Sequence, residues 1–283
     1  MATTATSFRP RDYWSSRVTG DGSLANVGHV ALGAYNQYAY PLRLEALTRA
    51  VQGLATAGVR VFDGGFGEGV YLEYWRQHGA GMVSGLDFSP RAVAAARERY
   101  PDSHLVQGDL AASGDLAGFG QYDIVTAIDV LYHIVDDEAW ARAVRNLLGL
   151  VGPGGSFIAS DKFPREGAYQ PMKHVRRRPL AMWTAAFREQ GFEMVRRVPV
   201  FVLMDDPITC GSHPWLGQLA HLQWKVLLKL VRMAMVNPAL HRATAALVAH
   251  AQLPVERLLL RRLCTTPNLE LIVARRAPVR LVR

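Results

Sequence analysis

The chain has 283 residues, of which 49% are hydrophobic and 20% are charged, and its formal net charge is +8. This composition predicts a folded protein with a sizeable core and excludes a disordered chain. With only Cys210 and Cys264 as cysteines, the sequence excludes a disulfide framework and a cysteine-based zinc site. The positive charge favours anionic partners, such as a phosphorylated substrate, an acidic membrane surface or a nucleic acid.

The N-terminal residues 1–14 lack the apolar stretch of a secretory signal. No uncharged apolar run reaches about 18 residues, the length that a membrane-spanning helix needs. We therefore expect a cytoplasmic protein.

The first part of the chain, residues 11–56, has apolar residues near helical spacing, which predicts an N-terminal helical lid over residues 1–56. After it, short apolar runs alternate with helical segments. We expect strands at 59–62, 82–87, 104–107, 122–129, 156–160 and 192–204. We expect helices at 69–78, 90–100, 138–150 and 179–190. This alternation predicts an α/β core over residues 57–204, with a mostly parallel sheet and helices on both faces.

Residues 205–267 depart from this alternation and predict a helical cap inserted before the last strand. We expect its helices to be interrupted at Pro207, Pro214, Pro238, Pro254 and Pro267. Residues 268–283 then provide the last core strand, at 269–275, and a basic tail. Insertions of this kind form either a cap or a contact between subunits, so a homo-oligomer is one alternative.

A glycine-rich loop, residues 63–69 with the sequence DGGFGEG, follows the first predicted strand and precedes a helix. Glycine lets the backbone turn sharply and approach a ligand, and the helix N-terminus offers free N–H groups to an anionic group. Asp87 ends the second predicted strand and Asp109 ends the third. These three features predict a ligand site along the carboxyl edge of the sheet. The alternative is that the glycines form a tight turn and the aspartates cap helices.

The pattern Asp63-x-Gly65-x-Gly67-x-Gly69 resembles the first motif of class I S-adenosylmethionine-dependent methyltransferases. Residues 126–134 resemble the fourth motif of this family, and residues 150–156 resemble the turn before its fifth strand. The resemblance implies a Rossmann-like, seven-stranded, mostly parallel sheet in the order 3-2-1-4-5-7-6.

The resemblance also implies that S-adenosylmethionine is the cofactor. Asp63 and the loop, including Gly64, would hold its methionine end. Asp87 would bind the ribose hydroxyls, with Phe88 against the adenine ring. Asp109 and Leu110 would meet the adenine edge, and Ile128 of the fourth motif would complete the cofactor site.

Two histidines are candidate catalytic residues, because a hydroxyl acceptor must lose a proton during methyl transfer. His133 follows the fourth strand, and His174 lies in a loop expected to overhang the site. The alternatives are a structural histidine bonded to the backbone for His133 and a solvated loop position for His174. Asp129 and Asp161 could together bind a divalent cation, but a third ligand is missing, so we predict no metal site.

Tyr35, Tyr38 and Arg176 are the candidate substrate-binding residues. The tyrosines would line the pocket from the lid, and the arginine would bind a phosphate or carboxylate of the substrate. Helix packing and surface solvation are the alternatives. Aromatic residues in and near the cap suit a bulky, partly apolar acceptor, and they are Trp183, Trp215 and Trp224.

The segment 215–236 predicts an amphipathic helix with an apolar face of Leu219, Leu222, Val226, Leu230 and Met233. Basic residues adjoin this face at His221, Lys225, Lys229 and Arg232. The helix could contact anionic lipid or a lipid-like substrate, and a solvated basic face is the alternative.

We expect S-adenosylmethionine-dependent methylation of a small molecule, and O-methylation of a bacterial secondary metabolite, sugar or lipid-like compound in particular. C-methylation of an alkene, an aromatic carbon or a prenyl diphosphate is the alternative within this class. The sequence disfavours a nucleic-acid methyltransferase, because no Asn/Asp-Pro-Pro-Tyr motif follows the fourth strand. A cofactor-binding cyclase or a scaffold protein is a further alternative.

Overall fold

The computed structural model describes residues 13–14 and 30–276. The rest of the predicted lid (1–12 and 15–29) and the end of the basic tail (277–283) lie outside the described residues.

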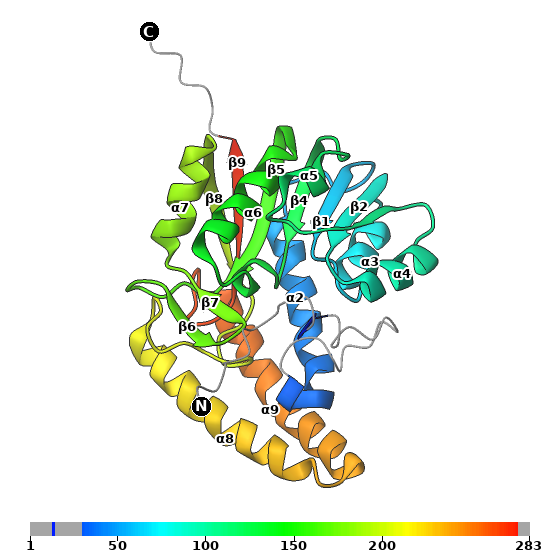
Figure 1. The fold of residues 1–283 in the computed structure, drawn as a ribbon. Coiled ribbons are helices and arrows are strands. Elements are labelled where there is room, and N and C mark those ends of the chain that lie inside the picture. Colours follow the sequence, from blue (N-terminus) through cyan, green and yellow to red (C-terminus); the bar gives the residue numbers. More distant parts are fainter. Residues whose placement is uncertain (1–12, 15–29, 277–283) are drawn as a thin grey trace, which may run out of the picture.

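A seven-stranded sheet forms the centre of the molecule, in the order β3-β2-β1-β4-β5-β9-β8 (Figure 1). Its strands are β1 (Arg60–Gly64), β2 (Met82–Asp87), β3 (His104–Gln107), β4 (Tyr122–Ala127), β5 (Val151–Asp161), β8 (Phe192–Pro199) and β9 (Glu270–Arg276). The first five pair in parallel, and β9 runs antiparallel to both β5 and β8. When only the seven strands of this sheet are numbered, in chain order, their order is 3-2-1-4-5-7-6, which confirms the prediction.

Helices cover both faces of the sheet, and each face has its own apolar cluster. The helices between the strands are α3 (Val70–Gln77), α4 (Pro90–Arg99), α5 (Ser113–Leu116), α6 (Asp137–Gly149) and α7 (Leu180–Glu189). One cluster contains Trp75 of α3, and the other contains Trp140 of α6 and Trp183 of α7. Both faces of the parallel strands are therefore buried, which explains why these strands are continuous apolar runs in the sequence.

The described part of the segment predicted to be a lid consists of a 3-10 segment, η1 (Val30–Tyr35), and helix α2 (Asn36–Ala50). Leu42 and Leu47 of α2 are fully buried in the same cluster as Trp75. The predicted helical character of this segment is present in α2, although the helix ends at Ala50 and not at residue 56.

Several features of the core differ from the predictions. Strand β5 begins at Val151 and not at residue 156, and the short helix α5 was not predicted. Residues 169–177 form a small hairpin of β6 (Tyr169–Met172) and β7 (Val175–Arg177), which the sequence analysis did not predict. Strand β8 ends at Pro199 and not at residue 204. The apolar residues that follow, Val200 to Val202, are buried in a loop whose backbone bonds to Leu269 and to the Glu256 side chain, so they look like strand in the sequence.

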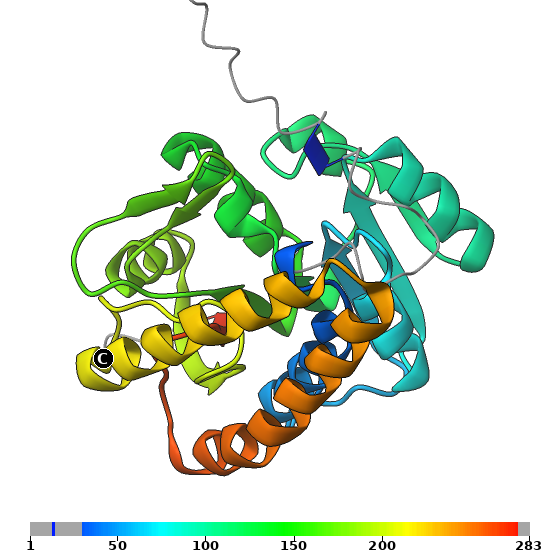
Figure 2. The same ribbon diagram turned by 90° about the horizontal axis from the view of Figure 1, so that it is seen from below.

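The insertion forms two long helices, α8 (Pro214–Ala234) and α9 (Pro238–Arg262), which pack on each other and on η1. Figure 2 shows them as an outer layer in which the two helices meet in a V. Pro214 and Pro238 occupy the first helical turns, where no N–H is needed. The expected interruption at Pro254 is wrong, because α9 continues through this exposed residue. In the part of the chain that the structure describes, no helix is long and apolar enough to cross a membrane.

Candidate functional site

A cavity of about 820 Å³ lies at the carboxyl edge of the parallel strands. Its lining combines the glycine loop after β1 with residues that follow β2, β3 and β4 and with residues of the β6–β7 hairpin. This is the edge at which the sequence analysis placed the ligand site, and it is where open α/β sheets bind ligands.

The glycine loop turns sharply at the base of this cavity. Gly65 has φ +75°, and a Cβ there would lie 2.6 Å from a methyl carbon of Val130. Gly67 has φ +50°, and a Cβ there would meet nothing within 4 Å. Both residues line the cavity, so the loop brings its bare backbone to the space where a ligand would lie.

Asp87 holds the loop in this shape. Its Oδ2 accepts the Gly67 N–H at 2.9 Å, and its Oδ1 accepts the Ser89 N–H at 2.8 Å. Burial raises the pKa of Asp87 above its usual value, and these two backbone bonds oppose the rise. Each oxygen has a second lone pair, so the carboxylate can accept two further hydrogen bonds from a ligand diol.

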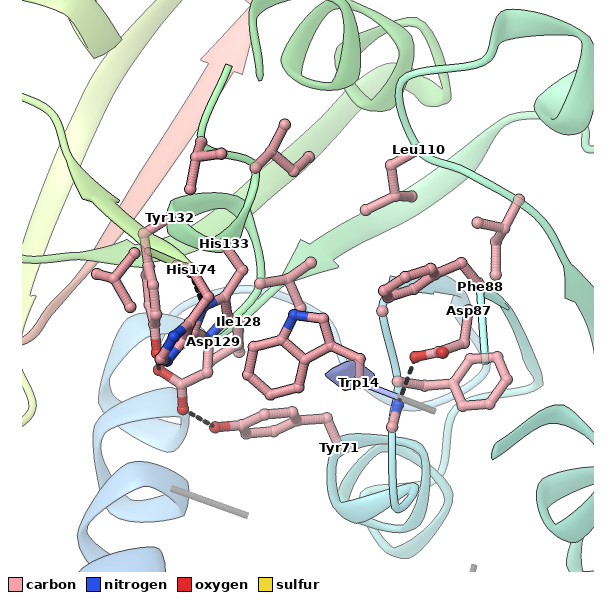
Figure 3. A pocket seen from close by; sticks show the side chains of 18 of the residues that line it. Trp14, Tyr71, Asp87, Phe88, Leu110, Ile128, Asp129, Tyr132, His133 and His174 are labelled. Carbon is pink, nitrogen blue, oxygen red and sulfur yellow. Dashed lines mark hydrogen bonds between the residues drawn. The ribbon is translucent and has the colours of Figure 1, made fainter. Parts of the chain in front are cut away.

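The other predicted adenosine contacts also line the cavity. Figure 3 shows Phe88 beside Asp87, with Leu110 and Ile128 facing the same space. Asp109 is half-buried in the lining, and its Oδ1 accepts the Ala111 N–H at 2.9 Å.

Asp63 lies behind the loop and does not line the cavity. Its Oδ1 accepts a hydrogen bond from the Thr126 hydroxyl at 2.6 Å, and its buried Oδ2 has no hydrogen-bond partner among the described residues. Burial raises the pKa of Asp63 to about 7, against the opposing effect of the Thr126 bond. Gly64 and Gly69 also lie outside the lining, Gly64 packed near Leu110 and Gly69 at the start of α3.

The two predicted catalytic histidines lie together in the cavity wall. The ring of His133 lies 5.8 Å from that of His174, and His133 Nδ1 donates to the backbone oxygen of His174 at 2.8 Å. In neutral His133 this bond leaves Nε2 as the acceptor nitrogen. The structural role weighed for His133 is therefore present, and the same bond fixes the tautomer that a general base requires.

Trp14 is a cavity residue that the sequence analysis did not single out. Its indole ring lies 4.2 Å from the His133 ring (Figure 3). Figure 3 shows it between the group of Tyr132, His133 and Asp129 on one side and Phe88 on the other. It thus divides an aspartate-and-histidine side of the cavity from a side that carries the predicted adenosine contacts.

The deep side of the cavity carries a buried ionic network that the sequence analysis also missed. Arg43 of α2 donates to Asp129 Oδ2 at 2.8 Å and lies 4.0 Å from Asp205. Lys162, which is 3% exposed, lies 3.4 Å from the same Asp205 carboxylate. Both Asp129 and Asp205 have positive φ, at 61° and 62°. Non-glycine residues rarely adopt this conformation, so the two turns are held by the contacts of their side chains.

Opposite effects act on the two cations of this network. Burial acts to lower the pKa of Arg43, but Asp129 and Asp205 outweigh it and the pKa lies well above its usual value. Burial lowers the pKa of Lys162, and Asp205 opposes that change. Lys162 is therefore the cation of this pair that more easily gives up its proton.

Arg176, the predicted substrate-binding arginine, does not line the cavity. It forms a two-pronged ion pair with Asp137, with N–O distances of 2.6 and 2.7 Å. Its neighbour Arg177 lines the cavity instead, with its guanidinium 4.0 Å from the centre of the Tyr132 ring. The alternation of side chains along β7 explains this exchange, because adjacent residues point to opposite faces of a strand.

The predicted aromatic contacts from the lid and cap lie elsewhere. Tyr35 is buried and donates its hydroxyl to Gln252 of α9, and Tyr38 lies beside His250. Neither lines the cavity, whereas Tyr40, on the next part of α2, does. None of the three predicted acceptor-side tryptophans lines it: Trp183 and Trp224 are core residues, and Trp215 is 82% exposed.

Asp161 does not complete a metal site with Asp129. It is fully buried, lies 3.1 Å from Arg177 and accepts the indole N–H of Trp183. Among residues 13–14 and 30–276, no group of three or more histidine, cysteine, aspartate or glutamate side chains is arranged to hold a metal ion.

Residues 62–159 match the family model described as "Methyltransferase domain". A ubiquinone biosynthesis O-methyltransferase from Thiobacillus denitrificans is 37% identical over 119 residues, which cover 41% of this chain and 48% of that protein. The Pectobacterium atrosepticum protein of the same name is 34% identical over 124 residues, which cover 42% and 48%. The chain thus spans about half the length of the curated relatives that it matches.

Several solved structures share the fold. The N-methyltransferase NodS from Bradyrhizobium japonicum, in complex with S-adenosylhomocysteine, is 16% identical with a TM-score of 0.51, covering 68% of this chain and 90% of that chain. The methyltransferase CcbJ from Streptomyces caelestis is 16% identical with a TM-score of 0.50, covering 84% and 90%. The [4+2]-cyclase SpnF is 18% identical with a TM-score of 0.50, covering 83% and 80%. At these identities the likeness concerns the fold.

Proposed function

We propose that the chain transfers a methyl group from S-adenosylmethionine to a small-molecule acceptor, because residues 62–159 match a methyltransferase-domain model and solved methyltransferases share its fold. The observation that carries this proposal is the single cavity in which the glycine loop, Asp87 and Asp109 meet the His133–His174 pair. The residues proposed to bind the cofactor and the histidines proposed to accept the proton thus line the same cavity.

The residues of the cavity fit S-adenosylmethionine. The loop at Gly67 leaves open space for an anionic group beside the start of α3, where helix N–H groups lie. Asp63 lies behind this lining, and because its buried Oδ2 has no partner among the described residues, we propose that it pairs with the ammonium group of the methionine end from behind the loop. We assign the ribose hydroxyls to Asp87 and the adenine to Phe88, Asp109 and Leu110, next to Ile128.

The bound cofactor supplies an activated methyl carbon, so the protein must mainly align the acceptor and take up its proton. We propose His133 Nε2 as the proton acceptor, because the bond from Nδ1 to the His174 backbone oxygen sets the required tautomer. His174 would orient this group and the acceptor. Its Nε2 lies 3.3 Å from the Tyr13 hydroxyl.

The proposed acceptor is a bulky hydroxyl compound with an apolar body, such as a bacterial secondary metabolite, sugar or lipid-like molecule. Two observations support it: the cavity lining includes Trp14, Tyr132 and Met172, and the two relatives reported above are O-methyltransferases. We assign an anionic group of the acceptor, where it has one, to Lys162 and Arg177, which line the cavity, and not to Arg176, which lies outside the lining.

The first test is a calorimetric titration of the purified protein with S-adenosylmethionine and with S-adenosylhomocysteine. We expect micromolar binding of both. Asp87→Ala is expected to weaken binding by about 1–3 kcal/mol, the cost of leaving buried polar groups without partners. Asp102→Ala, at an exposed carboxylate outside the cavity, is the matched control and should bind normally.

The second test is an acceptor screen with S-adenosylmethionine labelled with ¹³C in its methyl group. The chemical shift of the product distinguishes methylation at oxygen from methylation at carbon. His133→Ala is expected to lower turnover far more than cofactor affinity. Cofactor binding by native protein without methyl transfer to any compound of the screen would favour the cyclase or scaffold alternative. Absence of cofactor binding would refute the proposal.

A further inference from the structure

Helix α8 presents an apolar stripe to the outside of the molecule. The stripe consists of residues that are each at least half exposed: Trp215, Leu219, Leu222, Val226, Leu230 and Met233. Their spacing of three and four residues places them on one face of the helix. The opposite face is buried against the protein and includes Trp224, Leu227 and Val231. The helix is therefore apolar on two faces, and only one of them is covered.

The stripe continues into a groove between the two cap helices. This groove has a volume of about 550 Å³ and is lined by four stripe residues together with Val248 and Ala251 of α9. Figure 1 shows α8 as an outer helix beside the β6–β7 hairpin, whose residues also line the large cavity. Exposed apolar surface of this extent marks a contact site.

The charge around the stripe indicates which kind of partner covers it. Residues 207–269 contain seven lysine and arginine residues, three on α8 (Lys225, Lys229 and Arg232) and four arginines on α9. The same segment contains one carboxylate, Glu256, which is fully buried and accepts hydrogen bonds from the Val202 and Leu203 N–H groups. The cap segment is thus cationic without an exposed carboxylate of its own, and the neighbouring carboxylates Asp206 and Glu45 lie beside His221 and Arg257 and not beside the three cations of α8.

This charge pattern argues against a second copy of the chain as the partner. In a twofold contact the same surface occurs on both subunits. The lysines and arginine of α8 would then be present on both sides of the contact, and the cap segment has no exposed carboxylate to offset them. Anionic lipid headgroups offset these charges, while the apolar stripe enters the boundary between headgroups and acyl chains. The exposed indole of Trp215 suits the same boundary, where tryptophan is enriched.

We propose that the stripe on α8 docks the protein on the surface of an anionic lipid bilayer. The helix would lie in the plane of the surface, with its stripe in the lipid and Lys225, Lys229 and Arg232 against phosphate groups. Docking would place the cap against the bilayer, beside the hairpin that contributes to the cavity. The proposal does not depend on which reaction the cavity performs.

The test is flotation of the full-length protein with vesicles of phosphatidylcholine alone and with vesicles that also contain phosphatidylglycerol. We expect binding to the anionic vesicles only, weakened by added salt. Removal of one cation near the surface weakens binding roughly fivefold. Lys225→Glu/Lys229→Glu should therefore lower affinity at least ~25-fold. Arg142→Glu/Arg188→Glu, on α6 and α7, makes the same change of charge elsewhere and should bind as the native protein does.

Two further measurements test the apolar stripe. Leu222→Ser/Val226→Ser changes exposed side chains, so it should fold normally and lose vesicle binding. Vesicles should shift the tryptophan fluorescence of the native protein to shorter wavelength, and Trp215→Phe should remove this shift. Equal binding to neutral vesicles would overturn the proposal, and so would native-like binding by Lys225→Glu/Lys229→Glu or by Leu222→Ser/Val226→Ser. A stable native dimer that Leu222→Ser/Val226→Ser converts to monomer would overturn it too and assign the stripe to self-association.

Discussion

The pH dependence of stability tests how the cap is attached to the core. Glu256 of α9 is fully buried, and its two carboxylate oxygens accept the N–H groups of Val202 and Leu203 after β8. Two effects oppose each other here. Burial raises the pKa of Glu256 from 4.5 to about 7, and the backbone bonds act to lower it.

The direction of the pH dependence follows from the linkage between proton binding and folding. Because the pKa in the folded protein lies above that of an unfolded glutamate, the folded state binds the proton more tightly. This contribution to the free energy of unfolding is fully present below pH 4.5 and is lost as the pH rises through about 7. A difference of this size is worth about 3 kcal/mol.

The test substitution is Glu256→Gln, which removes the titratable carboxyl group and keeps the shape of the side chain. The amide turns one acceptor into a donor that faces a backbone N–H, which costs about 1–3 kcal/mol at every pH. Superimposed on this constant loss, the stability of the variant relative to the native protein should rise by about 2–3 kcal/mol between pH 5 and pH 8.

Urea unfolding at several pH values in this range measures the difference. Glu189→Gln, at an exposed position on α7, is the control and should show no such trend. A difference that stays constant with pH, or falls as the pH rises, would refute the reasoning. It would mean that the two backbone N–H bonds keep Glu256 charged throughout and that burial is not the dominant effect.

Two further predictions concern the cavity. Gly67→Ala places a Cβ in open space at a residue with φ +50°, so backbone strain should lower the free energy of unfolding by about 1–2 kcal/mol. We expect the same substitution to weaken cofactor binding by more than that. Calorimetry that finds unchanged cofactor affinity would contradict the assigned role of the loop. Asp129→Asn leaves buried Arg43 without its ion pair and should cost about 3–5 kcal/mol of stability in urea unfolding. A loss below about 1 kcal/mol would mean that Asp205 alone is sufficient for Arg43.

The features that sequence reasoning predicted correctly depend on short stretches of chain. The loop at Gly65 and Gly67 and the acidic end of β2 at Asp87 each lie within a few residues of a strand end. In parallel strands these ends meet at one edge, so the cavity could be located before any contact was known. The strand order, in contrast, was implied by the resemblance to the class I methyltransferases and not by this pattern.

The features that were missed depend on contacts between distant segments. Arg43 and Lys162 are 119 residues apart in the sequence and Lys162 and Asp205 are 43 apart, so no local pattern relates them. Their burial identifies them as members of one network only once the fold is known. Pro254 illustrates a second reason: a proline predicts a break from backbone sterics, but the packing of α9 on both sides of it keeps the helix continuous.

The two ends of the inserted cap lie side by side. The Val200 N–H donates to the Leu269 oxygen, and the Ile208 N–H donates to the Pro267 oxygen, each at 2.8 Å. Because β8 and β9 are already antiparallel neighbours, a short turn between them would complete the sheet without the cap. The entropy cost of closing such a loop grows only with the logarithm of its length, about 0.6 kcal/mol for each doubling. The fold can therefore exchange one cap for another of different length and surface while the sheet beneath it keeps its shape. The surface through which the protein contacts its partners can then evolve separately from the cavity at the strand ends.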